Sequence, residues 1–440
     1  MCNKLNIFLI GAALAYAGPL PAAAEPAPTT LTVGQAVDAA LRNNLAVKSA
    51  AAESRIKKRA SDFSFNKFYP SVSATATALE LNRVSPILVG VPGGWGVYLP
   101  DKANLALGFT IQEVFSPSFL RLMNQAALDY QGSVISKAKA EKRMTAAVKK
   151  FYYQLLVQKE AIALTLSRLD NAKERLRQAQ VSYEIGQGNE LNYRYAKASV
   201  EGLVPDLRAM ESSRLTALTQ FQEILGFEKR DDMELSGSLD DEKAPSGDEI
   251  KVEGARFDVS ESLLSVKRLE SALKLQDSSL LPNLILRYTA DPTLNDPSKN
   301  SPWDRGNWAQ SLGALSLTLS WSPSELIPGS DYWIKRSELE ERLALARANA
   351  DTTATNAGHD EENQRRLIRD SLDKLENLKD MVSDTKRSYE LTDASYKAGG
   401  GRLLDLQDAE LSWRGAQLQL LNERINLISL VYDLEAKYDK

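Results

Sequence analysis

Two carboxylates three residues apart are the strongest candidates for chemistry in this chain. Asp405 and Asp408 close the stretch 395–408 (SYKAGGGRLLDLQD), in which a Gly-rich turn leads into a helical pattern. Residues three apart share one face of a helix, so both carboxylates would point the same way. Such a pair attracts cations, especially multivalent ones. Acids are also common on a solvated face near a helix N-terminus, so both interpretations stay open at this point.

A weaker copy of this stretch lies 213 residues earlier, at 182–195 (SYEIGQGNELNYRY). In both copies glycines separate two helical patterns: Gly186 and Gly188 in the first, and Gly399, Gly400 and Gly401 in the second. Reversing a helix requires backbone positions with positive φ, which glycine adopts at the least cost. The sequence therefore predicts two helical hairpins, and any helical hairpin would use such glycines.

Composition argues against several other functions. The chain has 440 residues, a net charge of −4, one His and one Cys, which is Cys2. An acidic chain is a poor nucleic-acid binder, and one His with one Cys leaves soft-metal sites poorly supplied. His359 lies on a polar helical stretch where we expect it to be solvated, and two Glu–Arg pairs beside it, Glu361–Arg365 and Glu362–Arg366, form an exposed charged face. We therefore predict no enzyme activity, cofactor or metal site.

The N-terminal stretch has the pattern of a secretory signal peptide. Lys4 precedes an apolar run over 5–17, and three alanines at 22–24 form a cleavage site. We therefore assign residues 1–24 to a signal peptide. No later run reaches the roughly 20 apolar residues that a spanning helix needs, so any crossing of a membrane would use strands.

The rest of the chain is predicted to be built twice. The first repeat, 25–227, has a helix over 31–67 with a Thr32/Gln35 capping box. It continues with a β-hairpin over 71–113, a long helix over 117–185 and a return helix over 190–225. At Leu79 the alternation of apolar and polar residues shifts by one position, which suggests a bulge. The Gly/Pro-rich stretch 86–100 suggests a loop.

A charged segment, 228–253, is predicted to be a linker or equatorial region. The second repeat, 254–440, then has a helix, a hairpin over 283–321, a long helix over 328–398 and a return helix over 402–437. Apolar residues seven apart predict coiled-coil seams on the long helices and on the second return helix. The last of these seams would hold Leu404, Leu411, Leu418, Ile425 and Tyr432.

Four strands cannot close a membrane barrel, and open strand edges in lipid would leave backbone groups unpaired. If the strands lie in a membrane the chain must therefore oligomerise, and three copies would supply 12 strands. The expected fold class is an α+β membrane protein, in which a trimeric 12-stranded β-barrel continues into a long α-helical coiled-coil barrel. Aromatics at the strand ends favour membrane interfaces, with ordinary packing of a soluble hairpin as the alternative; they are Tyr69, Phe115, Trp303, Trp308 and Trp321.

The chain resembles the TolC-like outer-membrane efflux family over essentially its whole mature length. The motifs that carry the resemblance lie at 31–44, 69–72, 183–191, 281–282 and 396–409. The resemblance implies a homotrimer in the outer-membrane lipid of a Gram-negative-type cell, with a large periplasmic portion. It implies a passive exit duct for a tripartite efflux pump or a type I secretion system. Such ducts dock a periplasmic adaptor and an inner-membrane transporter of the RND, ABC or MFS type.

The resemblance also implies a gate at the two Gly-rich turns, which would lie at the periplasmic tip and contact the adaptor. Asp405 and Asp408 match the family's acidic pair near the constriction. Tyr396 matches a gate tyrosine, whose usual aspartate partner is Asn192 here. The family's gate arginine is replaced by Gly401, with Arg402 beside it. We therefore expect any ionic lock to lie on the second turn and to be weaker or rebuilt. The alternative is a soluble periplasmic coiled-coil scaffold or adaptor.

Overall fold

The computed structural model describes residues 30–80, 87–91, 94–98, 103–229, 233–237, 239, 254–295, 300–309, 313–398 and 400–439. The predicted signal peptide and most of the predicted linker lie outside these residues. The chain divides into two compact units. The tip unit comprises Met1–Leu45, Ala147–Ala244 and Leu375–Asn426, and the sheet unit comprises Ala46–Ala146, Pro245–Lys374 and Leu427–Lys440.

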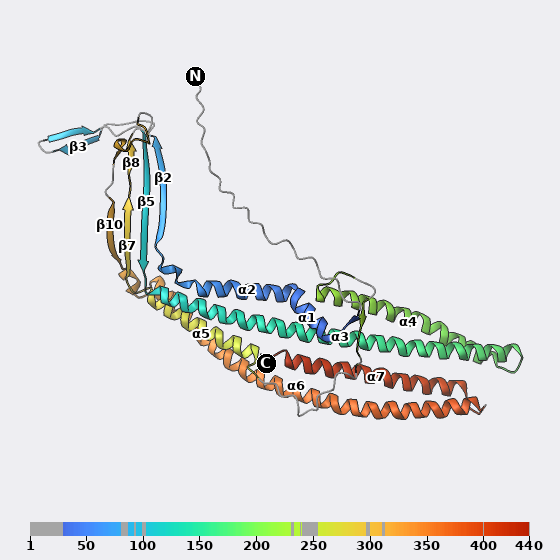
Figure 1. Cartoon of the computed structure of the whole chain (residues 1–440). Helices are drawn as coiled ribbons and strands as arrows, with labels where there is room; N and C mark the ends of the chain where they lie inside the picture. Colours follow the sequence, from blue (N-terminus) through green and yellow to red (C-terminus); the bar gives the residue numbers. More distant parts are fainter. Residues whose placement is uncertain are drawn as a thin grey trace, which may run out of the picture. The chain divides into compact units, whose positions relative to one another are not determined.

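The sheet unit contains four main antiparallel strands in the spatial order β2-β5-β7-β10 (Figure 1). They are β2 (Ser71–Glu80), β5 (Ala103–Phe115), β7 (Asn283–Ala290) and β10 (Ala314–Ser320). Each of the four predicted hairpin strands is therefore present in the structure. The two hairpins are joined because β5 pairs with β7. In the described chain no further strand pairs with the outer edges of β2 and β10.

The strand register separates apolar from polar residues. Val72 lies opposite Ile111, Ile111 opposite Tyr288, and Tyr288 opposite Leu315, so these four residues share one face. Because side chains alternate along a strand, the same face holds the other apolar residues of the predicted alternation. These include Ala74, Ala76, Leu107, Phe109, Leu284, Leu286, Leu317 and Leu319. The opposite face holds mostly polar residues, among them Ser73, Thr75, Thr110, Gln112, Arg287, Thr289, Ser316 and Thr318.

Two expectations for the strands are wrong. The β2–β5 ladder continues without a bulge as far as the Glu80–Ala103 pair, so the change of sequence parity at Leu79 does not disturb the register. The stretch predicted as a loop contains a small hairpin of β3 (Ile87–Val91) and β4 (Gly94–Tyr98). Glycine weakens a strand but does not prevent backbone pairing, which explains the error. The connection between β7 and β10 contains β8 (Thr293–Asn295), η2 (Arg305–Asn307) and β9 (Trp308–Ala309).

The helices of the sheet unit pack closely through small polar residues. They are α2 (Leu45–Asp62), α5 (Phe257–Ser278) and the sheet-unit portions of α3 (Ser118–Glu184) and α6 (Asp331–Lys397), with short turns η1 (Ser64–Phe68) and η3 (Pro323–Leu326). The hydroxyl of Ser278 donates to Ser118 at 3.1 Å, and Ser54 lies 3.5 Å from Ser133. Short side chains let the helix backbones approach, and the hydroxyls of Ser278 and Ser133 also donate to carbonyls of their own helices, those of Leu275 and Tyr130.

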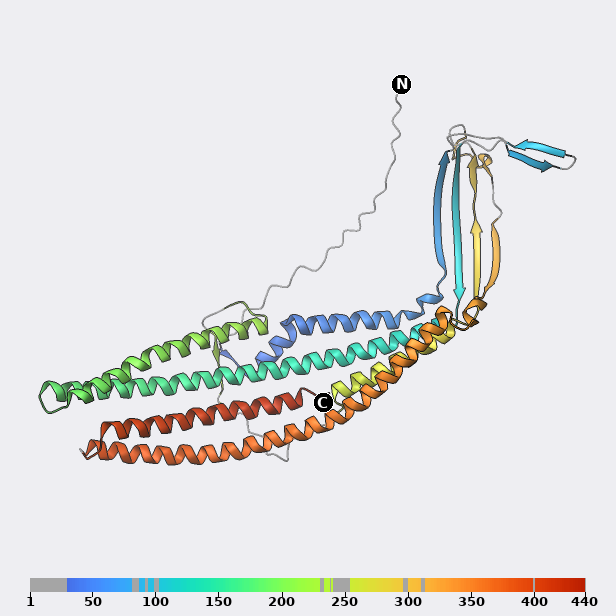
Figure 2. The ribbon, with the colours of Figure 1, turned by 180° about the vertical axis from the view of Figure 1, so that it is seen from behind.

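The tip unit contains two antiparallel helical hairpins. The end of α3 packs along α4 (Glu190–Leu225), and the end of α6 packs along α7 (Leu403–Glu435), as Figures 1 and 2 both show. The helices α3 and α6 each have 67 residues, and both begin and end 213 positions apart. Within the first hairpin Leu169, Ala172, Leu203 and Leu207 form a buried cluster. Pro205 lies inside α4 without ending it.

The predicted N-terminal helix is broken in two. After β1 (Thr30–Leu31), which pairs with β6 (Glu234–Leu235), α1 (Val33–Asn43) starts with the predicted capping box and ends at Asn44. Asn44 has an extended backbone, and its side-chain amide donates to the carbonyl of Ile224 at 2.9 Å. That carbonyl belongs to the last turn of α4, where carbonyls lack helical partners. Capping α4 therefore explains the break.

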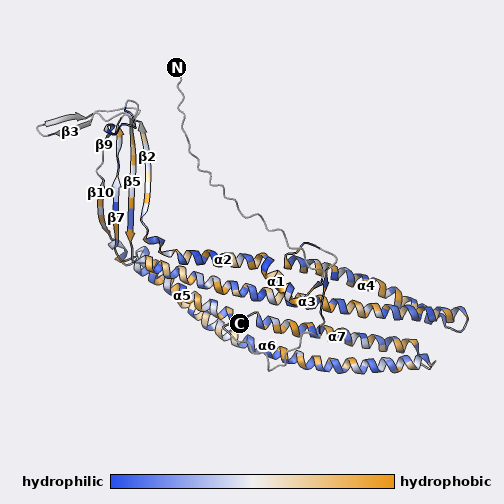
Figure 3. Cartoon of the chain, in the orientation of Figure 1, coloured by the Kyte–Doolittle hydropathy of each residue, from blue (hydrophilic) through white to orange (hydrophobic). Residues whose placement is uncertain are grey.

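No described helix combines the length and the apolar character that crossing a membrane requires. Figure 3 shows the reason, since hydrophilic and hydrophobic residues alternate along every helix.

Candidate gate at the helical tips

The first tip turn joins α3 to α4 through a set of backbone hydrogen bonds. The carbonyl of Ser182 accepts from the amides of Gln187 at 2.9 Å and Gly188 at 2.7 Å. Gly186 has a φ of 73°, a conformation that favours glycine. A Cβ on Gly188 would come within 2.9 Å of the Ser182 backbone, so this glycine is needed for close approach.

The second tip turn repeats this geometry 213 residues later. The carbonyl of Ser395 accepts from the amides of Gly400 and Gly401, both at 3.1 Å. A Cβ on Gly401 would lie 2.9 Å from the amide nitrogen of Tyr396. Gly188, Gly400 and Gly401 all lack a positive φ, so the expected reason for these glycines is wrong except at Gly186. Gly399 lies outside the described residues.

The structure places the predicted gate residues at these tips but does not bond them to one another. Asp405 and Asp408 are exposed on the first turns of α7, and Arg402 is exposed just before it. Asn192 is exposed on the first turn of α4, and Tyr396 is half-buried at the end of α6. Within the described chain no hydrogen bond joins Tyr396 to Asn192, and no ion pair joins Arg402 to either aspartate. The role of these five residues stays a prediction.

Sequence reasoning missed a polar cluster that consists of Arg175, Tyr389, Glu410 and Trp413, in which Glu410 is buried and the other three are half-buried. Arg175 of α3 donates Nη1 to Glu410 Oε2 of α7, and its Nη2 lies 3.4 Å from the Tyr389 hydroxyl of α6. The side chains of Arg175 and Glu410 are only 15% and 5% exposed. The rings of Tyr389 and Trp413 stack at 5.2 Å. The cluster therefore ties the first hairpin to the second.

A signal for this cluster was present in the sequence of α7. The predicted seam residues Leu404, Leu411 and Leu418 are exposed in the chain, whereas Leu403, Leu406 and Glu410 are buried. Tyr432, the last residue of the predicted seam, is buried, so over the first part of α7 the seven-residue pattern follows a different face from the one that packs within the chain. Spaced by three and four, the buried residues form a helical stripe with a carboxylate in it. A charged residue in a buried stripe is rarely found without a charged partner.

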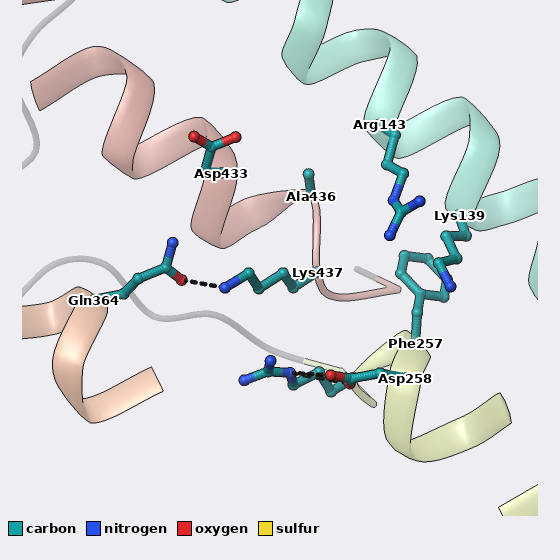
Figure 4. Close-up of a pocket in the computed structure, with 9 residues that line it drawn as sticks. Lys139, Arg143, Phe257, Asp258, Gln364, Asp433, Ala436 and Lys437 are labelled. Atoms are coloured by element: carbon teal, nitrogen blue, oxygen red, sulfur yellow. Dashed lines mark hydrogen bonds and ion pairs between the residues drawn. The ribbon is translucent and has the colours of Figure 1, made fainter. Parts of the chain in front are cut away.

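A second polar cluster lies in the sheet unit beside a cavity of about 450 Å³ (Figure 4). Lys437 donates to Asp360 at 2.6 Å and to Gln364 at 3.0 Å, and Arg256 donates to Asp360 at 2.8 Å. The hydroxyl of Tyr438 donates to Glu361 at 2.6 Å. These contacts fasten the end of the chain to α6. We call Arg256, Asp360, Glu361, Lys437 and Tyr438 the C-terminal clasp.

Contacts within the clasp shift the pKa values of Asp360, Glu361 and Tyr438. Burial opposes ionisation of Asp360, but hydrogen bonds from Lys437 and Arg256 prevail and lower its pKa. The Tyr438 hydroxyl lowers the pKa of Glu361, while burial and the bond to Glu361 raise the pKa of Tyr438 to about 12. The predicted Glu–Arg pairs at 361/365 and 362/366 are present, and His359 is exposed. However, Glu361 is half-buried rather than simply solvated, because it also accepts from Tyr438.

In the described part of the chain, no group of three or more His, Cys, Asp or Glu residues could hold a metal ion. No protein-family model and no curated protein matches the sequence. Solved structures do match. The CmeC outer membrane channel of Campylobacter jejuni aligns with a TM-score of 0.74 at 14% identity, covering 92% of this chain and 86% of that one. The chain has the fold of an outer-membrane channel.

Other channel structures give the same result. The open state of the MtrE outer membrane channel of Neisseria gonorrhoeae aligns with a TM-score of 0.73 at 18% identity, over 92% of this chain and 88% of that one. The outer membrane protein VceC of Vibrio cholerae aligns with a TM-score of 0.70 at 14% identity, over 92% and 94%. The predicted resemblance to TolC-like channels is thus confirmed at the level of the fold.

Proposed function

We propose that this chain is one protomer of an outer-membrane channel that serves as the passive exit duct of an efflux pump or secretion system. The observation that carries the proposal is the sheet, which has one apolar face and, among the described residues, two unpaired edges at β2 and β10. Side chains on that face are exposed, with Val72 at 62%, Leu315 at 72% and Leu317 at 66%. An apolar face of this extent needs a cover, and lipid provides one.

The unpaired edges require further copies of the chain. In lipid, the open edges of β2 and β10 would leave backbone N–H and C=O groups without partners. β2 and β10 are the outer strands of an even-numbered antiparallel sheet, so β10 of one copy can pair antiparallel with β2 of the next. Three copies give a closed barrel of 12 strands, and the polar face then lines its interior.

The exposed leucines of α7 support the same assembly. Leu404, Leu411 and Leu418 recur every seven residues and are 48%, 48% and 37% exposed. A stripe with this period packs against a neighbouring helix in a coiled coil. In a trimer the neighbour would come from another copy, and the helices would continue the barrel as a tube.

The remaining parts of the proposal follow from the likeness to channels. The Gly-rich turns are the periplasmic end, where an adaptor docks and connects the duct to an inner-membrane transporter. Asp405 and Asp408 supply six carboxylates to the constriction in a trimer, and Tyr396, Asn192 and Arg402 border it. The duct is not an enzyme and supplies no energy. Its gate opens when adaptor contacts favour the dilated tip over the closed one.

Neighbouring residues on opposite faces of β10 provide a matched test. Leu317→Lys places a charge on the proposed lipid face, and Thr318→Lys places the same charge on the lumen face; both positions are exposed in the chain. A lysine facing the middle of the bilayer costs about 2–4 kcal/mol. We expect L317K to be depleted from the outer-membrane fraction, and T318K to insert and conduct in planar bilayers with weaker cation selectivity.

Recovery of the unaltered protein in the soluble periplasm would reject the duct and favour the scaffold alternative. Equal insertion of L317K and T318K would also contradict the assigned lipid face.

A further inference from the structure

The cavity beside the C-terminal clasp is bordered by basic side chains from separate segments of the sheet unit. Lys139 and Arg143 come from α3. Arg256 lies just before α5, and Lys437 follows α7. Figure 4 shows Lys139 and Arg143 extending from α3 toward Phe257, whose buried ring forms part of the wall. The cavity of about 450 Å³ has the size of a small-molecule site.

The carboxylates that pair with these cations largely lie outside the cavity. Lys139 pairs with Glu261, and Arg256 and Lys437 both pair with Asp360. Among the described residues, neither Glu261 nor Asp360 belongs to the lining. The cations therefore face the cavity, and these two carboxylates approach them from elsewhere.

Two carboxylates do line the cavity, Asp258 and Asp433, and both already have partners. Asp258 accepts from Arg256 at 3.0 Å and from the amide of Val259 at 2.9 Å. Four cations against two carboxylates leave the lining with two positive charges in excess. A concave site with an excess of one charge concentrates ions of the opposite sign.

Arg143 is the cation of this lining that the protein leaves unpaired. In the described part of the chain its guanidinium has neither a hydrogen bond nor an ion pair, although it carries five N–H donors. Lys437 uses two of its three ammonium donors, on Asp360 and Gln364, and Lys139 uses one of three. The cavity thus offers many free donors, and a group that only accepts hydrogen bonds would complement it.

We propose that this cavity binds a small molecule through a phosphate or carboxylate group, with Arg143 as the main contact. A planar guanidinium matches two oxygens of either group, and the ammonium groups of Lys139 and Lys437 supply further donors. The bound anion offsets the excess positive charge of the lining. The site lies within the sheet unit, and the proposal does not depend on the channel function.

A bound anion also connects segments that are fastened separately. The clasp joins the end of the chain to α6 through Lys437 and Tyr438, whereas Arg143 belongs to α3. An anion held by both Arg143 and Lys437 links α3 to the end of the chain. Because this arrangement exists only in the folded protein, the ligand stabilises the fold in proportion to its occupancy.

Titration calorimetry on the full-length protein in detergent tests the site with two probes, inorganic phosphate and citrate. We expect at least one probe to bind, and the affinity to fall by about tenfold or more in Arg143→Gln, because the variant loses a charge-assisted hydrogen bond. Lys142→Gln is the matched control: it removes a positive charge from the adjacent residue of α3, which does not line the cavity. The control should bind like the unaltered protein.

The two probes distinguish the chemistry of the ligand. Binding of phosphate alone assigns the site to phosphate groups, and binding of citrate alone assigns it to carboxylates. In either case the affinity should decrease as sodium chloride is added, because salt screens the attraction between the anion and the exposed guanidinium of Arg143.

A measurement on the unaltered protein keeps the proposal testable if Arg143→Gln assembles poorly. We expect the bound probe to slow hydrogen exchange around residues 139–143, 256–258 and 434–438. The tip turn at 182–195 should exchange at the same rate with and without the probe.

Two results in calorimetry would overturn the site: no binding of either probe, or equal affinities in Arg143→Gln and Lys142→Gln. Protection that is as strong at the tip turn as beside the cavity would also overturn it, since the probe would then bind elsewhere. None of these results bears on the channel function, which conduction in planar bilayers tests separately.

Discussion

The two tip turns share a backbone and differ in their charges. Ser182 and Ser395 make equivalent hydrogen bonds, and Gly188 and Gly401 permit the same close approach. The positions that hold Asn192 and Tyr195 in the first copy hold Asp405 and Asp408 in the second. The repeated glycines fix the reversal of the chain, and the side chains that follow are free to take separate roles. Both copies therefore share the turn geometry, whereas acidic residues at these two matched positions occur in the second copy alone.

Moving the acidic residues from the second turn to the first should produce the largest effect on ion selectivity. Asp405→Asn with Asp408→Asn removes the six carboxylates that the proposed trimer would place at its constriction, so we expect cation selectivity and block by divalent cations in planar bilayers to fall by about tenfold. Asn192→Asp with Tyr195→Asp, added to this double variant, places acids at the matching positions of the first turn. We expect these acids not to restore the cation selectivity or the block by divalent cations. Full restoration by the first-turn acids would show that the two turns are electrostatically equivalent.

Adding a side chain at either of the closely packed glycines, Gly188 or Gly401, should destabilise its turn by a similar amount. Gly188→Ala and Gly401→Ala each force a Cβ against backbone atoms, which costs about 1–3 kcal/mol. Hydrogen exchange of the tip amides should therefore accelerate to a similar extent in both variants. Gly400→Ala is the control, because its Cβ would meet no atom closer than 3.9 Å. A large effect at Gly400, or an effect at only one of the other two glycines, would break the equivalence of the turns.

The helix caps should show a smaller and asymmetric effect. The side chain of Asn189 accepts from the amide of Leu191 at 2.9 Å, whereas the matching position before α7 holds Arg402. Asn189→Ala should cost about 1 kcal/mol in local stability, and Arg402→Asn should add a comparable amount by supplying the missing cap. Hydrogen exchange at the starts of α4 and α7 would measure both changes. Destabilisation by Arg402→Asn would imply that this arginine has a tertiary partner in the assembly.

Two pairs of matching positions in the repeats, Glu361 and Tyr438 against Val148 and Leu225, should respond differently to pH. Glu361 and Tyr438 of the clasp occupy positions where the first copy has the buried, apolar Val148 and Leu225. The lowered pKa values of Asp360 and Glu361 stabilise the folded state above their ordinary values of 3.8 and 4.5, and this contribution is lost as pH falls below them. The raised pKa of Tyr438 gives a contribution that is complete below pH 10.0 and lost as pH rises toward about 12.

We expect the total effect of the two carboxylates to stay below about 1 kcal/mol, because both are partly exposed to solvent. Hydrogen exchange followed between pH 6 and pH 3 should therefore show a modest loss of protection around residues 357–365 and 434–438, and none around Val148 and Leu225. In Asp360→Asn with Glu361→Gln the pH dependence should disappear. An equal loss of protection around Val148 and Leu225 would contradict this assignment.

Local patterns predicted the elements well because the deciding interactions are local. Alternation placed β2, β5, β7 and β10, and the 213-residue spacing located both long helices and both turns. The break at Asn44 escaped prediction because its partner, Ile224, is 180 residues away. The Arg175–Glu410 pair spans 235 residues, and the heptad pattern drew attention to Leu404 and Leu411 on another face of α7. A seven-residue repeat identifies an interface but not whether the partner lies in the same chain.

The unpaired edges of β2 and β10 also have a consequence for biogenesis. In the proposed trimer a lone chain does not complete the barrel, so the yield of folded channel would depend on the concentration of the chain itself. Until copies meet, each one carries two edges that can pair with any exposed strand, which makes edge-to-edge aggregation the competing reaction. On that proposal, overproduction of the chain alone should yield aggregates before it yields more channels.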